Sequence, residues 1–137
     1  MKKKILIVYA SYYKDISDNL LDNAVNHLEK TYNLNFLNNY VESTEVPGVF
    51  EIPVTIANSI KEYDGFIALG CVIKGQTPHF DFISRATTDA IMRLSVDYKK
   101  PIGNGIITCL NKKQAIVRSK KKGQEAANAV GLVLEKL

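Results

Sequence analysis

The chain alternates between short apolar runs and longer segments in which apolar residues recur at helical spacing. Continuous apolar runs occupy residues 4–10 (KILIVYA) and 65–73 (GFIALGCVI), which is typical of strands buried on both faces of a sheet. Residues 33–41 (NLNFLNNYV) alternate between polar and apolar and predict a less buried strand. Residues 101–109 (PIGNGIITC) predict a fourth strand, which contains glycine.

Segments with helical spacing separate and follow these strands. They predict helices over residues 15–32, 51–63, 82–94, 112–119 and 123–137. Pro53 is tolerated because it falls in the first turn of its helix. Alternating strands and helices form a parallel sheet covered on both faces. We therefore predict an α/β fold in one domain over residues 1–137, with a three-layer, doubly wound parallel four-stranded sheet of flavodoxin-like type.

The composition narrows the class of protein. With 46% hydrophobic and 23% charged residues, the chain resembles ordinary globular proteins. No apolar run approaches the roughly 20 residues needed to span a bilayer, and the first one is too short for a signal peptide. We expect a cytoplasmic protein with no membrane partner. Cys71 and Cys109 are then expected to stay reduced, and no Cys/His spacing suggests a metal site.

Charge is unevenly distributed along the chain. Residues 1–92 carry 8 Lys/Arg and 11 Asp/Glu, a net charge of −3, whereas residues 93–137 carry 10 and 3, a net charge of +7. The basic part could bind nucleic acid, a small phosphate or the acidic face of a neighbouring copy. Its densest stretch is residues 118–122 (RSKKK), although such runs are usually solvated surface. Charge alone does not choose among these partners.

Ligands of doubly wound folds bind beyond the carboxyl ends of the strands, which here are residues 11–15, 43–50 and 74–81. His79 lies in the third of these loops, just before a predicted helix. Histidine exchanges protons near neutral pH, and the N–H groups at a helix start bind anions. A surface or capping role for His79 is the alternative. His27 lies in a polar helix, and we interpret it as structural.

Two other loop features have both a structural and a functional interpretation. Glu51 is favourably placed near the positive end of a helix dipole, but it could also accept hydrogen bonds from a polyol. Tyr12 and Tyr13 end the first strand and could either stack on a planar ligand or pack the loop. The sequence contains no phosphate-binding loop, dinucleotide fingerprint or nucleophile elbow, which argues against a nucleotide-cofactor enzyme or a serine hydrolase.

Two long motifs stand out: VPGVFEIP at residues 46–53 and LGCVIKGQTPHFDFI at residues 69–83. Both motifs, and the spacing between them, resemble the signatures of the lumazine synthase family. IGNGIIT at 102–108 and QAIVR at 114–118 are similar to the family's last strand and following helix. The resemblance is collinear over almost the whole chain. It implies a cofactor-free enzyme that condenses 5-amino-6-(D-ribitylamino)uracil with 3,4-dihydroxy-2-butanone 4-phosphate to give 6,7-dimethyl-8-ribityllumazine, the penultimate step of riboflavin biosynthesis.

The resemblance also implies roles for individual residues. By position, His79 is the proton-transfer residue, Tyr12 stacks on the uracil ring and Glu51 binds hydroxyl groups of the ribityl chain. Arg118 binds the phosphate, and both Arg118 and Asn104 are expected to line the pocket of an adjacent subunit. Asn104 stands where the family often has Phe. The other implied substrate-binding positions are Val49, Phe50, Cys71, Val72, Ile73, and the phosphate-binding turn residues Gln76 and Thr77.

Because these sites are shared between subunits, the resemblance implies a homo-oligomer, a pentamer or larger. Members that form hollow shells have a glycine-bearing kink before the last helix. Here residues 119–122 (SKKK) are shorter than that segment, and no glycine occurs until Gly123. Lys122 matches a family lysine near the substrate across this gap.

Three alternatives stay open at this point. The first is the archaeal-type riboflavin synthase, which resembles this family but dismutates lumazine; TPHFDF at residues 77–82 favours the lumazine synthase. The second is a nucleic-acid-binding module that uses residues 118–122, although we expect no nucleic-acid partner. The third is a scaffold protein that has lost activity, which the intact His79, Glu51 and Arg118 argue against.

Overall fold

The computed structural model describes residues 1–137 and contains one parallel sheet of four strands. The strands are β1 (Ile5–Ala10), β2 (Val41–Val46), β3 (Gly65–Ile73) and β4 (Ile102–Cys109). Their order across the sheet is β2-β1-β3-β4, and every neighbouring pair is parallel. This order is that of a flavodoxin-like sheet, so the predicted fold class is confirmed.

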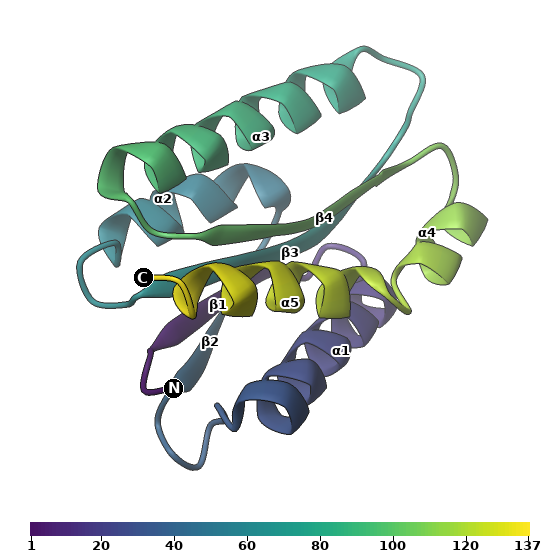
Figure 1. Ribbon diagram of the computed structural model, residues 1–137. Helices are drawn as coiled ribbons and strands as arrows, with labels where there is room; N and C mark the ends of the chain where they lie inside the picture. Colours follow the sequence, from purple (N-terminus) through teal and green to yellow (C-terminus); the bar gives the residue numbers. More distant parts are fainter.

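Helices cover both faces of this sheet (Figure 1). One face carries α1 (Lys14–Tyr32) and α5 (Lys122–Leu134), and the other carries α2 (Ile52–Asn58) and α3 (His79–Tyr98). A short 3-10 helix, η1 (Val49–Glu51), leads into α2, and α4 (Lys112–Arg118) follows β4. Both chain termini lie at the end of the sheet opposite α4 (Figure 1). None of these helices combines the length and hydrophobicity that a membrane crossing requires.

Each face of the sheet contributes to its own hydrophobic core. Ile67 and Leu69 of β3 pack in the cluster beneath α1 and α5, whereas Phe66 and Ala68 pack in the cluster beneath α2 and α3. All four side chains are fully buried. Because successive residues of a strand point to opposite faces, a strand in this position must be apolar throughout. This requirement accounts for the continuous apolar run at residues 65–73.

The predicted strand at residues 33–41 is wrong. Asn33 caps α1 in a left-handed conformation (φ 56°), and Asn39 is also left-handed (φ 66°). Between them, the backbone N–H of Asn35 donates to Oδ1 of Asn38, and the N–H of Asn38 donates to Oδ1 of Asn35, at 3.0 and 2.9 Å. Asparagine side chains thus take the backbone bonds that a strand would need, and β2 begins only at Val41.

Two helices also differ in extent from those predicted. The helix predicted over residues 51–63 ends at Asn58, since the backbone N–H groups of Ser59, Ile60 and Glu62 bond three residues back in turns. The helix predicted over residues 82–94 is longer. It begins at His79, directly after Pro78, and ends where Lys99 adopts a left-handed conformation (φ 56°).

Candidate functional site

A pocket of about 640 Å³ opens where the carboxyl ends of β1, β2 and β3 meet. This is the edge at which doubly wound sheets bind their ligands. Eight of the twelve predicted site residues line it: Tyr12, Val49, Phe50, Glu51, Cys71, Val72, Ile73 and His79. Tyr13, Gly48 and Ile83 complete the lining. The fold thus brings residues that are distant in the sequence into one cavity; Tyr12 and Cys71, for example, are 59 positions apart.

An aromatic pair forms the β1 side of the pocket. Tyr12 is 76% exposed, whereas Tyr13 is half-buried and packs against the core beneath α1 and α5. Their ring centroids are 4.9 Å apart at an interplanar angle of 78°, an edge-to-face arrangement. Burial, and then the nearby Cys71 and Tyr12, raise the pKa of Tyr13 above its ordinary value of 10.0. The Tyr13 phenol is therefore neutral at physiological pH.

The second side of the pocket is the turn of η1, which sits directly on β3. A Cβ atom at Gly70 would lie 2.6 Å from Cγ1 of Val49 and 3.2 Å from Cβ of Ala10. Only glycine permits this close approach. Val49 is consequently buried against the strand, and Phe50, 60% exposed, follows it toward the pocket mouth.

Glu51 supplies the carboxylate of the pocket. It precedes α2 as its N-cap residue, where a helix dipole favours negative charge. Gly48 leaves room for it, since a Cβ atom there would lie 3.2 Å from Oε1 of Glu51. The carboxylate forms no hydrogen bond or ion pair within the chain, although the Glu51 carbonyl accepts one from Thr55 Oγ1 at 2.8 Å. The carboxylate is thus available to accept hydrogen bonds from a ligand.

The end of β3 forms the floor of the pocket. Cys71 is 9% exposed, and burial raises the pKa of its thiol to about 12, with Cys109 adding to the effect and Arg118 opposing it. A thiol with such a pKa stays protonated at physiological pH and is a poor nucleophile. Cys71 therefore contributes an uncharged surface to the floor of the pocket, beside Val72 and Ile73.

His79 lies at the start of α3, exposed on the third side of the pocket. Its backbone N–H donates to Oγ1 of Thr77 at 3.4 Å, and its imidazole has no partner within the chain. Ile83, one helical turn later, adds an apolar surface to the same side. Gln76 and Thr77 are exposed in the preceding loop and do not line the pocket.

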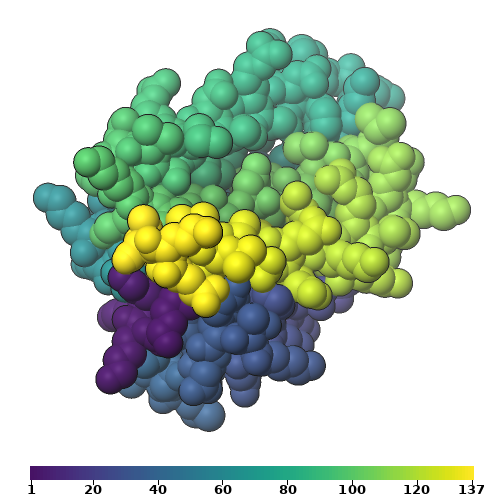
Figure 2. All heavy atoms as spheres, in the orientation of Figure 1, coloured from purple at the N-terminus to yellow at the C-terminus, as the bar shows by residue number.

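Asn104 and Arg118 lie outside the pocket of their own chain. Asn104 is exposed on the edge strand β4, where its Oδ1 accepts a hydrogen bond from the N–H of Ile106 at 3.1 Å. Arg118 ends α4, and its Nη1 donates to the carbonyl of Thr108 at 2.9 Å. It lines a separate basic hollow of about 440 Å³ with Lys120, Lys121, Lys122 and Glu125. In Figure 2, α4 and the turn into α5 form the right-hand edge of the molecule.

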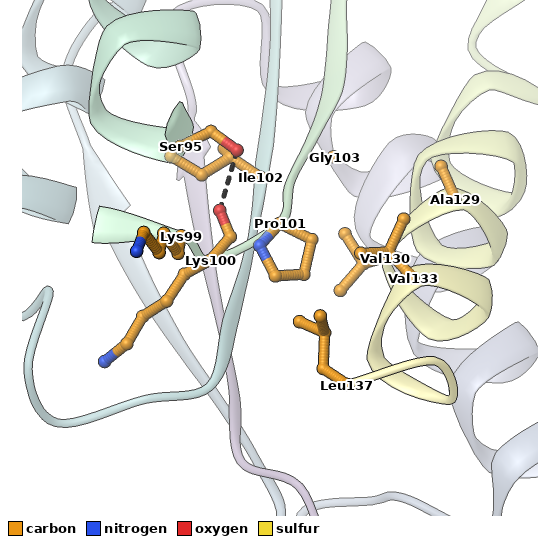
Figure 3. Close-up of a pocket in the computed structure, with 10 residues that line it drawn as sticks. All are labelled: Ser95, Lys99, Lys100, Pro101, Ile102, Gly103, Ala129, Val130, Val133 and Leu137. Carbon is orange, nitrogen blue, oxygen red and sulfur yellow. Dashed lines mark hydrogen bonds between the residues drawn. The ribbon is translucent and has the colours of Figure 1, made fainter. Parts of the chain in front are cut away.

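A further hollow of about 380 Å³ lies at the opposite end of the sheet, between α5 and the start of β4 (Figure 3). Its wall on the α5 side is apolar, with Pro101 facing Val130 and Val133. The Ser95 hydroxyl donates to the Lys100 carbonyl at 2.7 Å, and the Lys100 ammonium donates to the Ile60 carbonyl at 2.5 Å. These polar groups are satisfied within the chain, so this hollow lacks the free carboxylate and imidazole of the pocket at the strand ends.

The sequence carries only weak signals for the three further residues that line the pocket. Tyr13 is an aromatic candidate only as the neighbour of Tyr12, and both rings line the pocket. Ile83 is four residues after His79, so helical spacing places it on the same side of α3. Gly48 stands in a Pro-Gly turn. Its contribution to the pocket is the space it leaves for the side chain of Glu51, three residues later, which no local pattern reveals.

The fold and the pocket together define a class: a flavodoxin-like protein whose strand-end pocket combines an aromatic pair, a free carboxylate and a free imidazole. Comparison with known proteins gives the family. The sequence profile of the 6,7-dimethyl-8-ribityllumazine synthase family matches residues 2–137, and the chain belongs to this family.

Relatives that carry the same name align with most of the chain. A 6,7-dimethyl-8-ribityllumazine synthase of Agrobacterium fabrum is 42% identical over 148 residues, covering 98% of this chain and 94% of the relative. One from Bartonella bacilliformis is 43% identical, covering 91% and 84%. One from Bdellovibrio bacteriovorus is 36% identical, covering 98% and 77%.

Proposed function

We propose that this chain condenses 5-amino-6-(D-ribitylamino)uracil with 3,4-dihydroxy-2-butanone 4-phosphate to give 6,7-dimethyl-8-ribityllumazine in riboflavin biosynthesis. Membership of the family supports this reaction. The observation that carries it for this molecule is the pocket itself. It gathers side chains from both signature motifs, residues 46–53 and 69–83, around one cavity.

The reaction joins two molecules and releases a phosphate and two waters. The 5-amino group of the uracil attacks the ketone carbon, and loss of water leaves an imine. Elimination of the phosphate then gives an enol, which tautomerises to a carbonyl. The ribitylamino nitrogen attacks that carbonyl, and loss of the second water closes the ring. Each step moves protons, and the first joins two substrates, so orientation and acid–base catalysis are what the protein must supply.

The pocket offers a group for each of these needs. The exposed ring of Tyr12 is placed to stack on the planar pyrimidine. Glu51, whose carboxylate is free, is placed to accept hydrogen bonds from the ribityl hydroxyls. His79, with a free imidazole at the pocket wall, is the group that would exchange protons with the reacting nitrogen and oxygen atoms.

The phosphate-binding groups are the part of the site that one chain does not complete. Gln76 and Thr77 are in the loop before α3, and Arg118 donates a hydrogen bond to the carbonyl of Thr108 near the end of β4; none of the three lines the pocket. We propose that the chain forms a homopentamer in which Arg118 and Asn104 reach the pocket of an adjacent subunit. The exposed apolar side chains of α3, Phe82, Met92 and Val96, support an interface, each being more than 60% exposed in the isolated chain.

The decisive experiment mixes the purified protein with both substrates and follows the fluorescence of lumazine. We expect product only when both substrates are present, and no product from either alone. Incubation with lumazine alone tests the archaeal-type riboflavin synthase reaction, in which riboflavin would appear. Riboflavin from lumazine, without lumazine from the two substrates, would overturn the proposed function.

A further inference from the structure

We propose that Tyr13 is a positioning residue for the pyrimidine substrate, because it fixes the orientation of the Tyr12 ring that stacks on that substrate. This inference rests on the proposed function of the pocket. Tyr13 contributes to substrate affinity through its neighbour Tyr12.

The two tyrosines differ in how firmly the chain holds them. Tyr12 is 76% exposed, and Tyr13 is the only aromatic ring that it contacts. Tyr13, in contrast, is half-buried against the core beneath α1 and α5. Its carbonyl accepts a hydrogen bond from the N–H of Ser17 at 2.9 Å, which fixes its backbone as the N-cap of α1. The anchored ring therefore supports the exposed one.

The geometry of the pair explains why this support affects binding. Rings 4.9 Å apart at 78° have the edge-to-face arrangement that aromatic pairs favour, so it restricts the rotation of Tyr12. An exposed ring without that contact would rotate freely, and binding would have to stop this motion. A ring that is already oriented loses less conformational freedom when the pyrimidine stacks on it.

The Tyr13 hydroxyl forms no hydrogen bond within the chain, whereas those of Tyr32 and Tyr63 do. The pairing of Tyr13 with Tyr12 is therefore one of ring against ring, with no hydrogen bond between them. This difference predicts that phenylalanine can replace Tyr13, and that an aliphatic residue cannot.

The test measures KM for each substrate in Tyr13→Leu, Tyr13→Phe, Tyr12→Leu and the double variant with leucine at both positions. We expect Tyr13→Leu to raise KM for the pyrimidine about 2- to 12-fold, the range typical of an aromatic pair, and to leave KM for the keto-phosphate unchanged. Tyr13→Phe should recover most of this loss. In the Tyr12→Leu background, Tyr13→Leu should add almost nothing, because the ring that it orients is gone. Tyr98→Leu is the control for the loss of a surface tyrosine, because Tyr98 is exposed at the C-terminal end of α3, whereas His79 at the other end lines the pocket.

Near-ultraviolet circular dichroism adds a readout that does not depend on activity. Tyr12→Leu and Tyr13→Leu should each remove the signal of the coupled ring pair, and the double variant should remove no more than either. If Tyr13→Leu does not fold, Tyr13→Met takes its place.

Three results would overturn the proposal while lumazine formation by the unchanged protein still supported the proposed function. They are an unchanged pyrimidine KM in Tyr13→Leu, effects of the two substitutions that simply add, and a Tyr13→Phe variant as impaired as Tyr13→Leu. Absence of lumazine formation by the unchanged protein would instead contradict the proposed function itself.

Discussion

A Cβ atom on Gly70 would lie only 2.6 Å from Cγ1 of Val49, closer than two such carbon atoms approach in folded proteins. The backbone of β3 is therefore in direct contact with the turn that presents Phe50 and Glu51 to the pocket. A side chain at position 70 would therefore force the Val49 side chain, or the turn that carries it, to shift. The pocket thus depends on a residue that does not line it.

Gly70→Ala is expected to lower both stability and substrate affinity. Overpacking of this kind typically costs about 1–3 kcal/mol, and displacement of Glu51 should raise KM for the ribitylamino-uracil. Chemical denaturation and steady-state kinetics measure the two effects. Gly75→Ala is the matched control for stability, since a Cβ atom there would meet nothing within 4 Å. Equal free energies of unfolding for the two variants would contradict the importance of the Gly70 contact.

His79→Ala is expected to lower turnover by roughly 10²-fold or less. General acid–base catalysis typically contributes about 10²–10⁴-fold, but in this variant the substrates stay oriented and water can replace the imidazole. The measurement is kcat at saturating concentrations of both substrates over about pH 6–8, the range in which histidine changes charge. Full activity of the variant across that range would show that His79 is not the proton-transfer residue.

Arg118→Ala is expected to impair use of the keto-phosphate selectively. A charge-assisted hydrogen bond to phosphate contributes about 1.5–3 kcal/mol, which corresponds to a 10- to 150-fold rise in apparent KM. Arg118→Lys should restore only part of the affinity, since lysine lacks the planar fork of the guanidinium group. Lys120→Ala removes a charge from the same basic hollow and is the control. The assignment fails if KM for the keto-phosphate is the same in Arg118→Ala as in the unchanged protein.

Cys71 is expected to resist alkylation in the folded protein. Burial raises the pKa of its thiol from 9.0 to about 12, so the thiolate that reacts is scarce at pH 9.0. Because the folded chain holds this proton more tightly, the stability that the group contributes is present below pH 9 and is lost as the pH rises toward 12. Iodoacetamide labelling followed by peptide mass spectrometry, with the denatured chain as reference, measures the reactivity. Rapid labelling of folded Cys71 at pH 9.0 would refute this expectation.

Sequence patterns predicted the elements whose residues are constrained by burial on two sides. The run at residues 65–73 is β3, because a central strand between two helical layers tolerates few polar residues. The alternation at residues 33–41 gave a wrong strand because the true strand, β2, is not buried on both faces. β2 is an edge strand with exposed polar positions between Val41 and Val46, and its signal is weaker than the chance alternation of the loop before it.

For the site, the position of a residue could be predicted better than the orientation of its side chain. The loops after β1 and β3 and the turn after β2 hold the pocket residues because parallel strands end at one edge. That Arg118 donates to the carbonyl of Thr108, and does not line this pocket, depends on where α4 packs. No local pattern encodes that packing, and only the resemblance to the family suggested that Arg118 acts on another subunit.

The turn between α4 and α5 bears on how far the assembly extends. Ser119 is fully buried, and its hydroxyl and carbonyl accept hydrogen bonds from the Nδ2 atoms of Asn19 and Asn23 of α1 at 3.1 and 3.3 Å. At Gly123, a Cβ atom would lie 2.1 Å from the Leu20 carbonyl oxygen, so α5 starts in close contact with α1. This turn is short and fixed to its own subunit, unlike the glycine-bearing kink of shell-forming members. Its exposed lysines would also repel each other across a tight contact between pentamers.

We therefore expect a free pentamer and not a closed shell. On the proposed function, Arg118 and Asn104 reach the pocket of a neighbouring subunit, and the −3 and +7 parts of the chain would meet head to tail, an arrangement that closes into rings. Light scattering on the purified protein should give about 77 kDa, five times the 15.3 kDa of one chain. A particle of about 0.92 MDa, sixty times that mass, would refute the free pentamer, and an active species of 15.3 kDa would refute the shared site. Mixing Arg118→Ala with His79→Ala separates these cases further, because only shared sites allow two impaired variants to form some intact pockets together.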